Sequence, residues 1–310
     1  MSTALAREEL QRAAVGRPTA LTLGIFDGVH RGHQALMTRL VESAKRTALA
    51  PGVVTLHPHP RQVITPAVQT SYITSLEDRL DLLRGLGLPC VVPVTFTSEL
   101  AQTDAADFVG LLVEHLQMKH LVIGPDFALG RCRGGDPETL HALGRELHFT
   151  VEVIELLEGA EGKVSSTDIR RALSAGAIDQ VNALLGRRFS LHGPVIYGVQ
   201  RGRTIGFPTA NIAVGADRAL PAVGVYATVA HVAGAPLPSV TNIGVRPTFN
   251  DDAALSIECH VFDFDGDLYR RDLRIEFAAR LRGERKFDGV DALVAQMKRD
   301  SAAAREVLGA

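Results

Sequence analysis

The chain has 310 residues, a formal net charge of −2, and 46% hydrophobic residues. This length predicts two domains, each large enough to bury a core. The balanced charge gives no excess of Lys and Arg of the kind that binds nucleic acid. No apolar run approaches the roughly 18 residues of a membrane span. Three scattered cysteines and the lack of a signal-peptide pattern indicate a cytoplasmic protein with reduced thiols.

The first motif begins with an apolar run at residues 21–25, which predicts a buried strand, and an apolar stripe after it predicts a helix. His30 and His33 lie three positions apart at the start of that helix, so they share one face. A helix start offers free N–H groups and a partial positive charge, and Gly28 and Gly32 would let an anion approach the backbone. The pattern predicts phosphate held by backbone and imidazole groups. A purely structural histidine pair is the alternative.

The chain resembles the nucleotidylyltransferase superfamily in the string from Gly24 to His33, Gly-Ile-Phe-Asp-Gly-Val-His-Arg-Gly-His, and this full form resembles the prokaryotic FAD synthetases. Members of the superfamily join a nucleoside monophosphate to a phosphate acceptor. The resemblance implies that His30 and His33 are catalytic. It also implies nucleotide contacts at Gly24, Phe26, Asp27, Gly28 and Gly32.

A second predicted strand, at residues 53–56 after a break at Pro51-Gly52, ends in His57-Pro58-His59-Pro60. Prolines stop a strand and stiffen the loop at its carboxyl end, where open α/β sheets bind ligands. A stiff polar loop is the alternative; the resemblance implies that His57 and Pro58 bind flavin. Further elements alternate and predict a doubly wound parallel sheet. The predicted helices are at about 76–86, 103–115 and 136–148, and the predicted strands at 90–94, 119–123 and 151–154.

The loop from Gly124 to Gly130 follows a predicted strand and resembles the family segment Gly-x-Asp-Phe-x-Phe-Gly. The resemblance implies that Asp126 binds nucleotide and Phe127 binds flavin, whereas a solvated surface loop is the alternative. Leu129 stands where the family has an aromatic residue, which argues against a ring-stacking role at this position.

Hydroxyl side chains gather at another predicted helix start, in Ser165-Ser166-Thr167. Such residues can cap a helix and bind phosphate, and Arg170, one turn on, can reach the same oxygens with its planar fork. A plain helix cap is the alternative. By resemblance this segment holds the triphosphate of ATP, with Arg170 as a catalytic residue.

From Phe189 the chain changes to short β-rich segments separated by Gly, Pro and Asp-Gly turns, with one helix at about residues 290–308. This rhythm predicts an antiparallel barrel or sandwich with a terminal helix. Gly186-Arg-Arg188 is the predicted linker, so the predicted domains are residues 1–186 and 187–310.

The second half carries the string Gly202-Arg-Thr-Ile-Gly-Phe-Pro-Thr-Ala-Asn211. One interpretation is a loop whose backbone packs on ATP through Gly202, Gly206 and Pro208, with Thr209 and Asn211 offering oxygens to Mg²⁺. A Gly/Pro turn between strands is the alternative.

Four further segments, at residues 242–249, 256–260, 265–269 and 281–287, resemble riboflavin kinase in the same order. By this resemblance Glu258 is the general base on the ribityl hydroxyl, although a strand glutamate is ordinarily a surface residue. Two departures from the family pattern are Val199-Gln200 and Arg270-Arg271, the latter where a glycine is usual after Tyr269.

Together the resemblances imply a bifunctional enzyme that uses ATP to phosphorylate riboflavin to FMN and then transfers AMP from a second ATP to FMN, giving FAD and pyrophosphate. The implied cofactor is Mg²⁺ and the implied partners are small molecules, with no nucleic acid or membrane; a homo-oligomer is left open. The alternatives are a transferase for nicotinamide mononucleotide or phosphopantetheine, and a flavin or nucleotide sensor with one decayed site.

Overall fold

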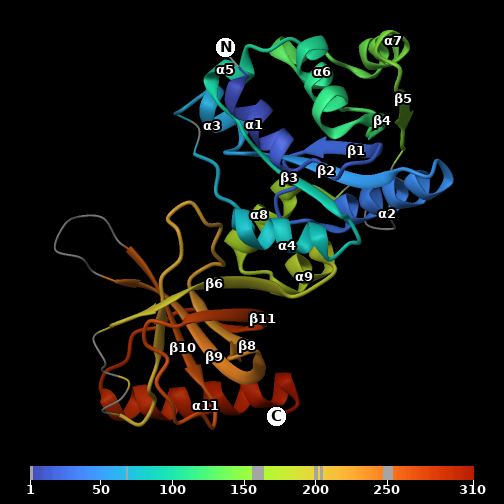
Figure 1. Cartoon of the computed structure of the whole chain (residues 1–310). Coiled ribbons are helices and arrows are strands. Elements are labelled where there is room, and N and C mark those ends of the chain that lie inside the picture. Colours follow the sequence, from blue (N-terminus) through green and yellow to red (C-terminus); the bar gives the residue numbers. More distant parts are fainter. Residues whose placement is uncertain (1–2, 68, 156–163, 199–201, 203–204, 247–253) are drawn as a thin grey trace. The chain divides into compact units, whose positions relative to one another are not determined.

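The computed structural model describes residues 3–67, 69–155, 164–198, 202, 205–246 and 254–310 (Figure 1). The chain forms two compact units, Met1–Ser166 and Thr167–Ala310. Within the described part, no helix combines the length and apolar character needed to cross a lipid bilayer.

The first unit is built on a five-stranded sheet in the order β3-β2-β1-β4-β5, and all its strand pairs are parallel. Its strands are β1 (Thr19–Gly24), β2 (Ala50–His57), β3 (Cys90–Thr95), β4 (Met118–Ile123) and β5 (Thr150–Val153). The strand order reverses between β1 and β4, where open α/β sheets bind ligands at the carboxyl ends. The predicted doubly wound parallel sheet is confirmed.

Helices cover both faces of this sheet because side chains alternate along each strand. Leu21 and Leu23 of β1 pack in one core cluster with residues of α1 and α6, while Ala20 packs in another with residues of α2 and α4. The helical elements are α1 (Ala4–Arg12), α2 (Arg31–Arg46), α3 (Pro60–Ile64), α4 (Leu76–Arg84), α5 (Ser98–Ala101), α6 (Ala105–Leu116), the 3₁₀ turn η1 (Arg131–Arg133) and α7 (Pro137–Leu147).

Strand β2 begins earlier than the sequence predicts, because Pro51 and Gly52 belong to it. Pro51 is paired with β1, but the pairing of β2 with β3 starts only at Gly52, so the missing N–H of the proline lies beyond the neighbouring strand. A Cβ at Gly52 would come within 2.8 Å of the Cys90 and Leu21 side chains. The two residues therefore fit the strand rather than break it.

The second unit is a closed antiparallel barrel in the order β10-β7-β6-β11-β8-β9, with α11 packed on its outside. The barrel is confirmed, and the sandwich alternative is not found. The strands are β6 (Phe189–Ile196), β7 (Ala210–Ile212), β8 (Gly224–Val232), β9 (Ala235–Arg246), β10 (Ala254–Val261) and β11 (Asp272–Arg282). The unit also contains α8 (Ser166–Ala175), α9 (Ile178–Leu185) and α11 (Val290–Leu308).

Helices α8 and α9 are joined to the barrel by hydrogen bonds. The Asn182 side chain donates to the Phe277 carbonyl at 2.9 Å and accepts from the Phe189 N–H at 2.7 Å. The Ala222 N–H donates to the Leu173 carbonyl at 2.9 Å. These bonds explain why both helices cluster with the second unit and not with the sheet.

Candidate functional site

The turn between β1 and α2 has an unusual backbone. Three of its residues have positive φ: Phe26 (52°), Gly28 (83°) and Val29 (41°). Gly28 suits its left-handed conformation, and a Cβ there would also come within 3.1 Å of the Ile73 side chain. The buried Phe26 ring lies over Gly24, where a Cβ would come within 2.8 Å of it. Glycine at positions 24 and 28 therefore makes room for the Phe26 and Ile73 side chains and permits the backbone conformation of the turn.

The two histidines of the motif form a stacked pair at the start of α2. Their ring centroids are 3.6 Å apart with an interplanar angle of 20°, and the Phe26 ring meets His33 edge-on at 5.2 Å. His30 is the N-cap of α2, and its Nδ1 accepts from the His33 N–H at 3.4 Å. In neutral His30 the proton is therefore on Nε2. Gly32 leaves room for this ring, since a Cβ there would come within 3.3 Å of it.

The environment of His33 favours its neutral form. Desolvation by burial, followed by the positive charges that His30 and Arg79 can carry, lowers the pKa of His33 well below its usual value of 6.5. The Nδ1 atom of His33 has no hydrogen-bond partner among the residues described. At neutral pH this site therefore presents an uncharged imidazole, which can donate or accept a hydrogen bond at a phosphate.

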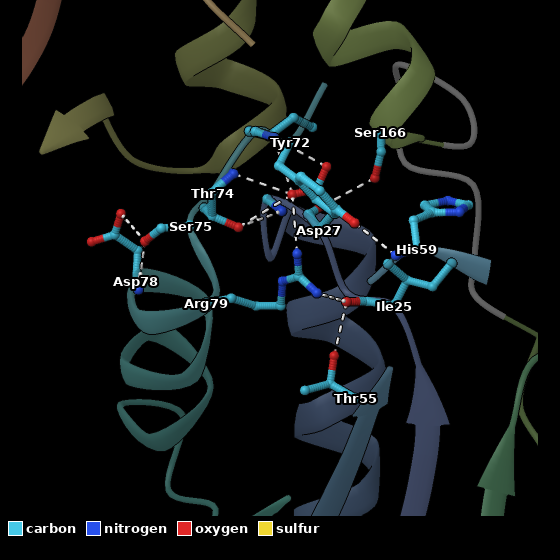
Figure 2. Close-up of polar contacts among 12 residues, drawn as sticks. Ile25, Asp27, Thr55, His59, Tyr72, Thr74, Ser75, Asp78, Arg79 and Ser166 are labelled. Carbon is cyan, nitrogen blue, oxygen red and sulfur yellow. Dashed lines mark hydrogen bonds and ion pairs between the residues drawn. The ribbon is translucent and has the colours of Figure 1, made fainter. Parts of the chain in front are cut away.

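Asp27 is held by protein groups inside the turn (Figure 2). Its carboxylate is 2% exposed and accepts from the backbone N–H groups of Ile73 and Thr74 at 3.1 Å. The Thr74 hydroxyl in turn accepts from the Gly28 N–H at 3.1 Å, and an Arg79 nitrogen lies 3.8 Å from Asp27. The carboxylate thus fixes the segment before α4 against the turn.

The loop after β2 joins the same network. The His59 N–H donates to the Tyr72 hydroxyl at 2.6 Å (Figure 2). That hydroxyl donates to the Gln62 side chain at 2.5 Å. The His57 ring lies 5.3 Å from the Tyr72 ring, and the His57–Pro58 peptide bond is cis. His57 and Pro58 therefore lie at the carboxyl edge of the sheet, beside a tyrosine that the sequence analysis did not select.

The loop after β4 places its two predicted residues differently. Asp126 is exposed, whereas Phe127 is half-buried and packs against the core cluster that contains Leu21. Leu129 packs against the same cluster, and its backbone pairs with Gly135. Leu129 thus acts as a core residue here, which accounts for the aliphatic side chain.

Two predicted serines reach the histidine turn from far along the sequence. The Ser166 hydroxyl donates to the Asp27 carbonyl at 3.0 Å, and Ser165 precedes it directly (Figure 2). The Val164 carbonyl would lie 3.6 Å from a Cβ at Gly32. Thr167 and Arg170 belong to the second unit, on α8.

The second unit brings together the predicted base and metal ligand of the barrel. Glu258 of β10 is paired in register with Asn211 of β7 on one side and with Asn242 of β9 on the other. Residues paired across antiparallel strands share a face of the sheet, with Cβ atoms about 5 Å apart. The three side chains therefore form a row, and Asn242 is a member of it that the sequence analysis quoted only within a motif.

The two glycines of the 202–211 string fit their positions for different reasons, Gly202 through a close backbone contact and Gly206 through its positive φ. A Cβ at Gly202 would come within 2.2 Å of the Phe207 carbonyl oxygen. The Phe207 N–H donates to the Gly202 carbonyl at 2.8 Å. Gly206 has a φ of +84°. The loop is fastened to β10, since the His260 ring nitrogen lies 2.8 Å from the Pro208 carbonyl oxygen. Arg203, Thr204, Val199, Gln200 and residues 247–249 of the predicted motifs lie outside the described residues.

A cavity of about 600 Å³ opens beside this loop. Thr209 and Pro208 line one side of it, and the loop from Phe264 to Tyr269 lines another. The remaining walls are Val195, Ala210, Cys259 and Val261. Its size suits a nucleotide or drug-sized ligand. Its lining mixes apolar residues with polar ones such as Thr209, Asp265 and Asp267. Tyr269 stacks on Tyr197, with ring centroids 4.1 Å apart.

Comparisons with known proteins assign both halves. A family model described as FAD synthetase matches residues 13–168, and one described as riboflavin kinase matches residues 185–308. Proteins named bifunctional riboflavin kinase/FMN adenylyltransferase include one from Listeria monocytogenes, 38% identical over 90% of this chain and 89% of that protein, and one from Pseudomonas fluorescens, 39% identical over 93% of each.

A solved structure described as a macrolide-efflux protein from Streptococcus pneumoniae has the same fold. Its TM-score is 0.86 with 29% identity, and the match covers 95% of this chain and 96% of that one. On the family models and on identity over most of its length, this chain belongs to the bifunctional riboflavin kinase/FMN adenylyltransferase family, whose two activities make FMN and then FAD.

Proposed function

We propose that the barrel phosphorylates riboflavin with Glu258 as the general base. We further propose that the histidine turn of the first unit transfers AMP from ATP to FMN. The observation that carries the first assignment is the row of Asn211, Glu258 and Asn242 beside the cavity-lining Thr209. It sets a carboxylate between two amide side chains on one face of the sheet, although Asn211 and Glu258 lie 47 positions apart in the sequence.

In the kinase reaction, Glu258 accepts the proton of the ribityl hydroxyl as its oxygen attacks the γ-phosphorus of ATP. The bond to the bridging oxygen breaks, and ADP leaves. The cavity beside Thr209 is proposed to hold the nucleotide, with Gly202, Gly206 and Pro208 supplying backbone contacts. A nearby carboxylate is needed because a primary hydroxyl is a weak nucleophile at neutral pH.

Thr209 and Asn211 would hold Mg²⁺, which prefers oxygen ligands and neutralises phosphate charge when bound. Asn211 is 7% exposed, and a Cβ at Gly198 would come within 2.3 Å of its amide, so the side chain is closely confined. Among the described residues, no group of three or more His, Cys, Asp or Glu side chains could hold a metal. This donor set fits an ion that takes its other oxygens from ATP and water.

In the adenylyl transfer, a phosphate oxygen of FMN attacks the α-phosphorus of ATP, and pyrophosphate leaves. His30 and His33 are proposed to donate hydrogen bonds to the phosphate oxygens where charge develops. The supporting observation is their stacking at the start of α2, which follows the central strand of the sheet. The contacts of flavin with His57, Pro58 and Phe127 stay predictions, as does a cytoplasmic location, while a homo-oligomer is left open. The predicted contacts of ATP are those with Gly24, Phe26, Asp27, Gly28, Gly32, Asp126, Ser165, Ser166, Thr167 and Arg170.

The kinase assignment predicts the effect of Glu258→Gln, which keeps the size of the side chain but removes its basicity. We expect FMN formation from riboflavin to fall by about 10²–10⁴-fold, the usual contribution of a general base. Riboflavin affinity, measured by fluorescence quenching, should change little, and FAD formation from supplied FMN should persist. Glu276→Gln, on a different strand of the barrel, is the matched control. An unchanged kinase rate in Glu258→Gln would show that the base is another group.

The adenylyl-transfer assignment predicts that replacing His30 and His33 together by alanine lowers FAD formation from FMN by about 10²–10³-fold or more, the range for removing donors to a developing charge. Riboflavin phosphorylation, measured in the same samples by chromatography of the flavins, should stay within error of the unmodified chain. Wild-type FAD formation in the double variant would assign the histidines a structural role only.

A further inference from the structure

Among the described residues, Arg79 has the largest fully buried side chain, at 0% exposure. It lies on α4, whose start is fixed by a cap in which the Ser75 hydroxyl accepts from the Asp78 N–H at 3.0 Å. The guanidinium donates to the Ile25 carbonyl at 3.0 Å (Figure 2). It also lies 3.5 Å from the Leu56 carbonyl oxygen. One cation thus contacts the carboxyl ends of two neighbouring strands, β1 and β2.

The same guanidinium has two further neighbours. Its second terminal nitrogen lies 3.8 Å from an oxygen of Asp27, and its central carbon lies 5.4 Å from the centroid of the Tyr72 ring. Asp27 fixes the segment before α4, and Tyr72 accepts from the backbone of His59. Arg79 is therefore at the centre of a network that joins the histidine turn to the His57–Pro60 loop.

A contribution to the stability of the fold does not by itself explain why an arginine is buried at position 79. Burying a cation costs several kcal/mol, and replacing a buried ion pair by well-packed apolar residues is often neutral or stabilising. The turn next to it, however, holds three positive-φ residues on the two sides of Asp27, namely Phe26, Gly28 and Val29, and such backbone persists only where surrounding contacts over-determine it. Arg79 and Asp27 supply contacts of that kind on the two sides of Phe26.

We infer that Arg79 is a positioning residue for adenylyl transfer: its guanidinium holds the Ile25–Gly28 turn so that His30 and His33 face the phosphates of ATP. The inference rests on the proposed role of the two histidines. It also has an electrostatic side, since Arg79 is one of the groups that lower the pKa of His33. The other group is His30, stacked on His33, and Asp27 is the carboxylate beside Arg79.

The test compares Arg79→Gln and Arg79→Lys in the full chain. Glutamine keeps an N–H donor for the Ile25 carbonyl but has no charge, whereas lysine keeps the charge without the planar fork. Arg84→Gln is the matched control, because Arg84 is an exposed arginine at the end of the same helix, paired with Asp81 at 3.0 Å. The measurements are kcat and KM for FAD formation from FMN across pH 5–9, riboflavin phosphorylation as an internal reference, and circular dichroism for folding.

For Arg79→Gln we expect kcat for FAD formation to fall by about 10²-fold, the scale of a small misplacement at a reacting centre, with KM for FMN less affected. The acid limb of the kcat profile should move to higher pH, because loss of the cation raises the pKa of His33. For Arg79→Lys we expect a smaller loss, about tenfold, with the acid limb unmoved. Arg84→Gln should match the unmodified chain in both respects.

Measuring Arg79→Gln in the double variant His30→Ala/His33→Ala, the histidine background, distinguishes loss of histidine positioning from a general loss of structure. If Arg79 acts through the imidazoles, Arg79→Gln should lower the residual FAD formation of this background by less than about threefold. The inference is overturned if folded Arg79→Gln keeps its kcat, or if it loses activity equally in both backgrounds with an unmoved acid limb. Should Arg79→Gln fail to fold, Arg79→Lys decides alone, and a wild-type kcat there overturns the inference. Wild-type FAD formation in the histidine background would instead contradict the proposed function.

Discussion

At the scale of single residues, Arg270 is one of the non-glycine residues of the described chain whose backbone is left-handed. Arg270 has a φ of +62° at the position where the riboflavin kinase pattern has glycine. Its side chain is exposed, and its backbone N–H donates to the Val195 carbonyl at 3.0 Å. The arginine therefore carries backbone strain that a glycine would avoid, next to Tyr269 in the wall of the cavity.

Arg270→Gly should stabilise the barrel. A left-handed non-glycine residue costs roughly 1–2 kcal/mol, and the extra freedom of glycine in the unfolded chain returns about 0.5–1 kcal/mol of that, so the net gain is about 0.5–1 kcal/mol. Scanning calorimetry should show the barrel transition at a higher temperature. Arg271→Gly is the control, because Arg271 is exposed but has no positive φ; it should lower that temperature. A gain in both variants would point to charge removal as the cause.

At the scale of elements, the end of the sheet away from the histidine turn is held by a buried polar cluster. The Ser43 hydroxyl of α2 donates to Glu152 of β5 at 2.6 Å and lies 2.9 Å from the His120 ring of β4. His120 also lies 3.0 Å from the same Glu152 oxygen and 2.7 Å from the Thr150 hydroxyl. The cluster joins one helix to two strands and thereby fixes the register of α2, which begins with His30.

Ser43→Ala should lower the free energy of unfolding by about 1–2 kcal/mol at pH 7, because it removes the hydrogen bonds that the Ser43 hydroxyl makes with Glu152 and His120. Desolvation raises the pKa of Glu152, but the hydrogen bonds from Ser43 and His120 and the charges of His120 and Arg46 outweigh it, so the pKa is lowered. A lowered carboxyl pKa stabilises the fold above the unfolded-state value and loses that effect as the pH falls through the folded-state value.

The difference between Ser43→Ala and the unmodified chain should therefore shrink in urea titrations below about pH 4.5. Thr38→Ala is the control, since Thr38 lies on the exposed side of the same helix and its hydroxyl donates to the Gln34 carbonyl. A difference that stays constant from pH 7 to pH 4 would mean that Ser43 does not act on the charged form of Glu152.

At the scale of the whole molecule, the boundary between the two halves falls at different residues in the family match and in the compact units of the structure. The sequence predicts a linker at residue 186, and the riboflavin kinase model begins at residue 185. The compact units instead meet at Ser166, because α8 and α9 bond to the barrel through Asn182 and Leu173. The kinase residues Thr209, Asn211 and Glu258 lie beyond both boundaries.

A fragment of residues 167–310 should therefore be more stable than one of residues 187–310. The shorter fragment loses the buried side chains Leu173, Val181 and Leu185, each worth roughly 1.5–3 kcal/mol when fully buried. Urea midpoints measured by circular dichroism should differ in that direction. Both fragments should phosphorylate riboflavin when folded, and neither should make FAD, because both lack His30 and His33. Equal midpoints would show that the two helices contribute nothing to the barrel.

The sequence by itself determined the elements and the residue types of both sites, because both depend on neighbours along the chain. Strand alternation, the helical stripe after His30 and the glycines of the turn all leave local patterns. Only the tertiary structure decided which distant side chains meet, since packing brings them together without a sequence signal. The pairing of Asp27 with Arg79, the bond from Ser166 to Asp27, and the row of Asn211, Glu258 and Asn242 are of this kind. Arg79 shows the limit most clearly: arginine is almost never fully buried unless it is paired, and the fold buries this side chain against Asp27 and the Ile25 carbonyl.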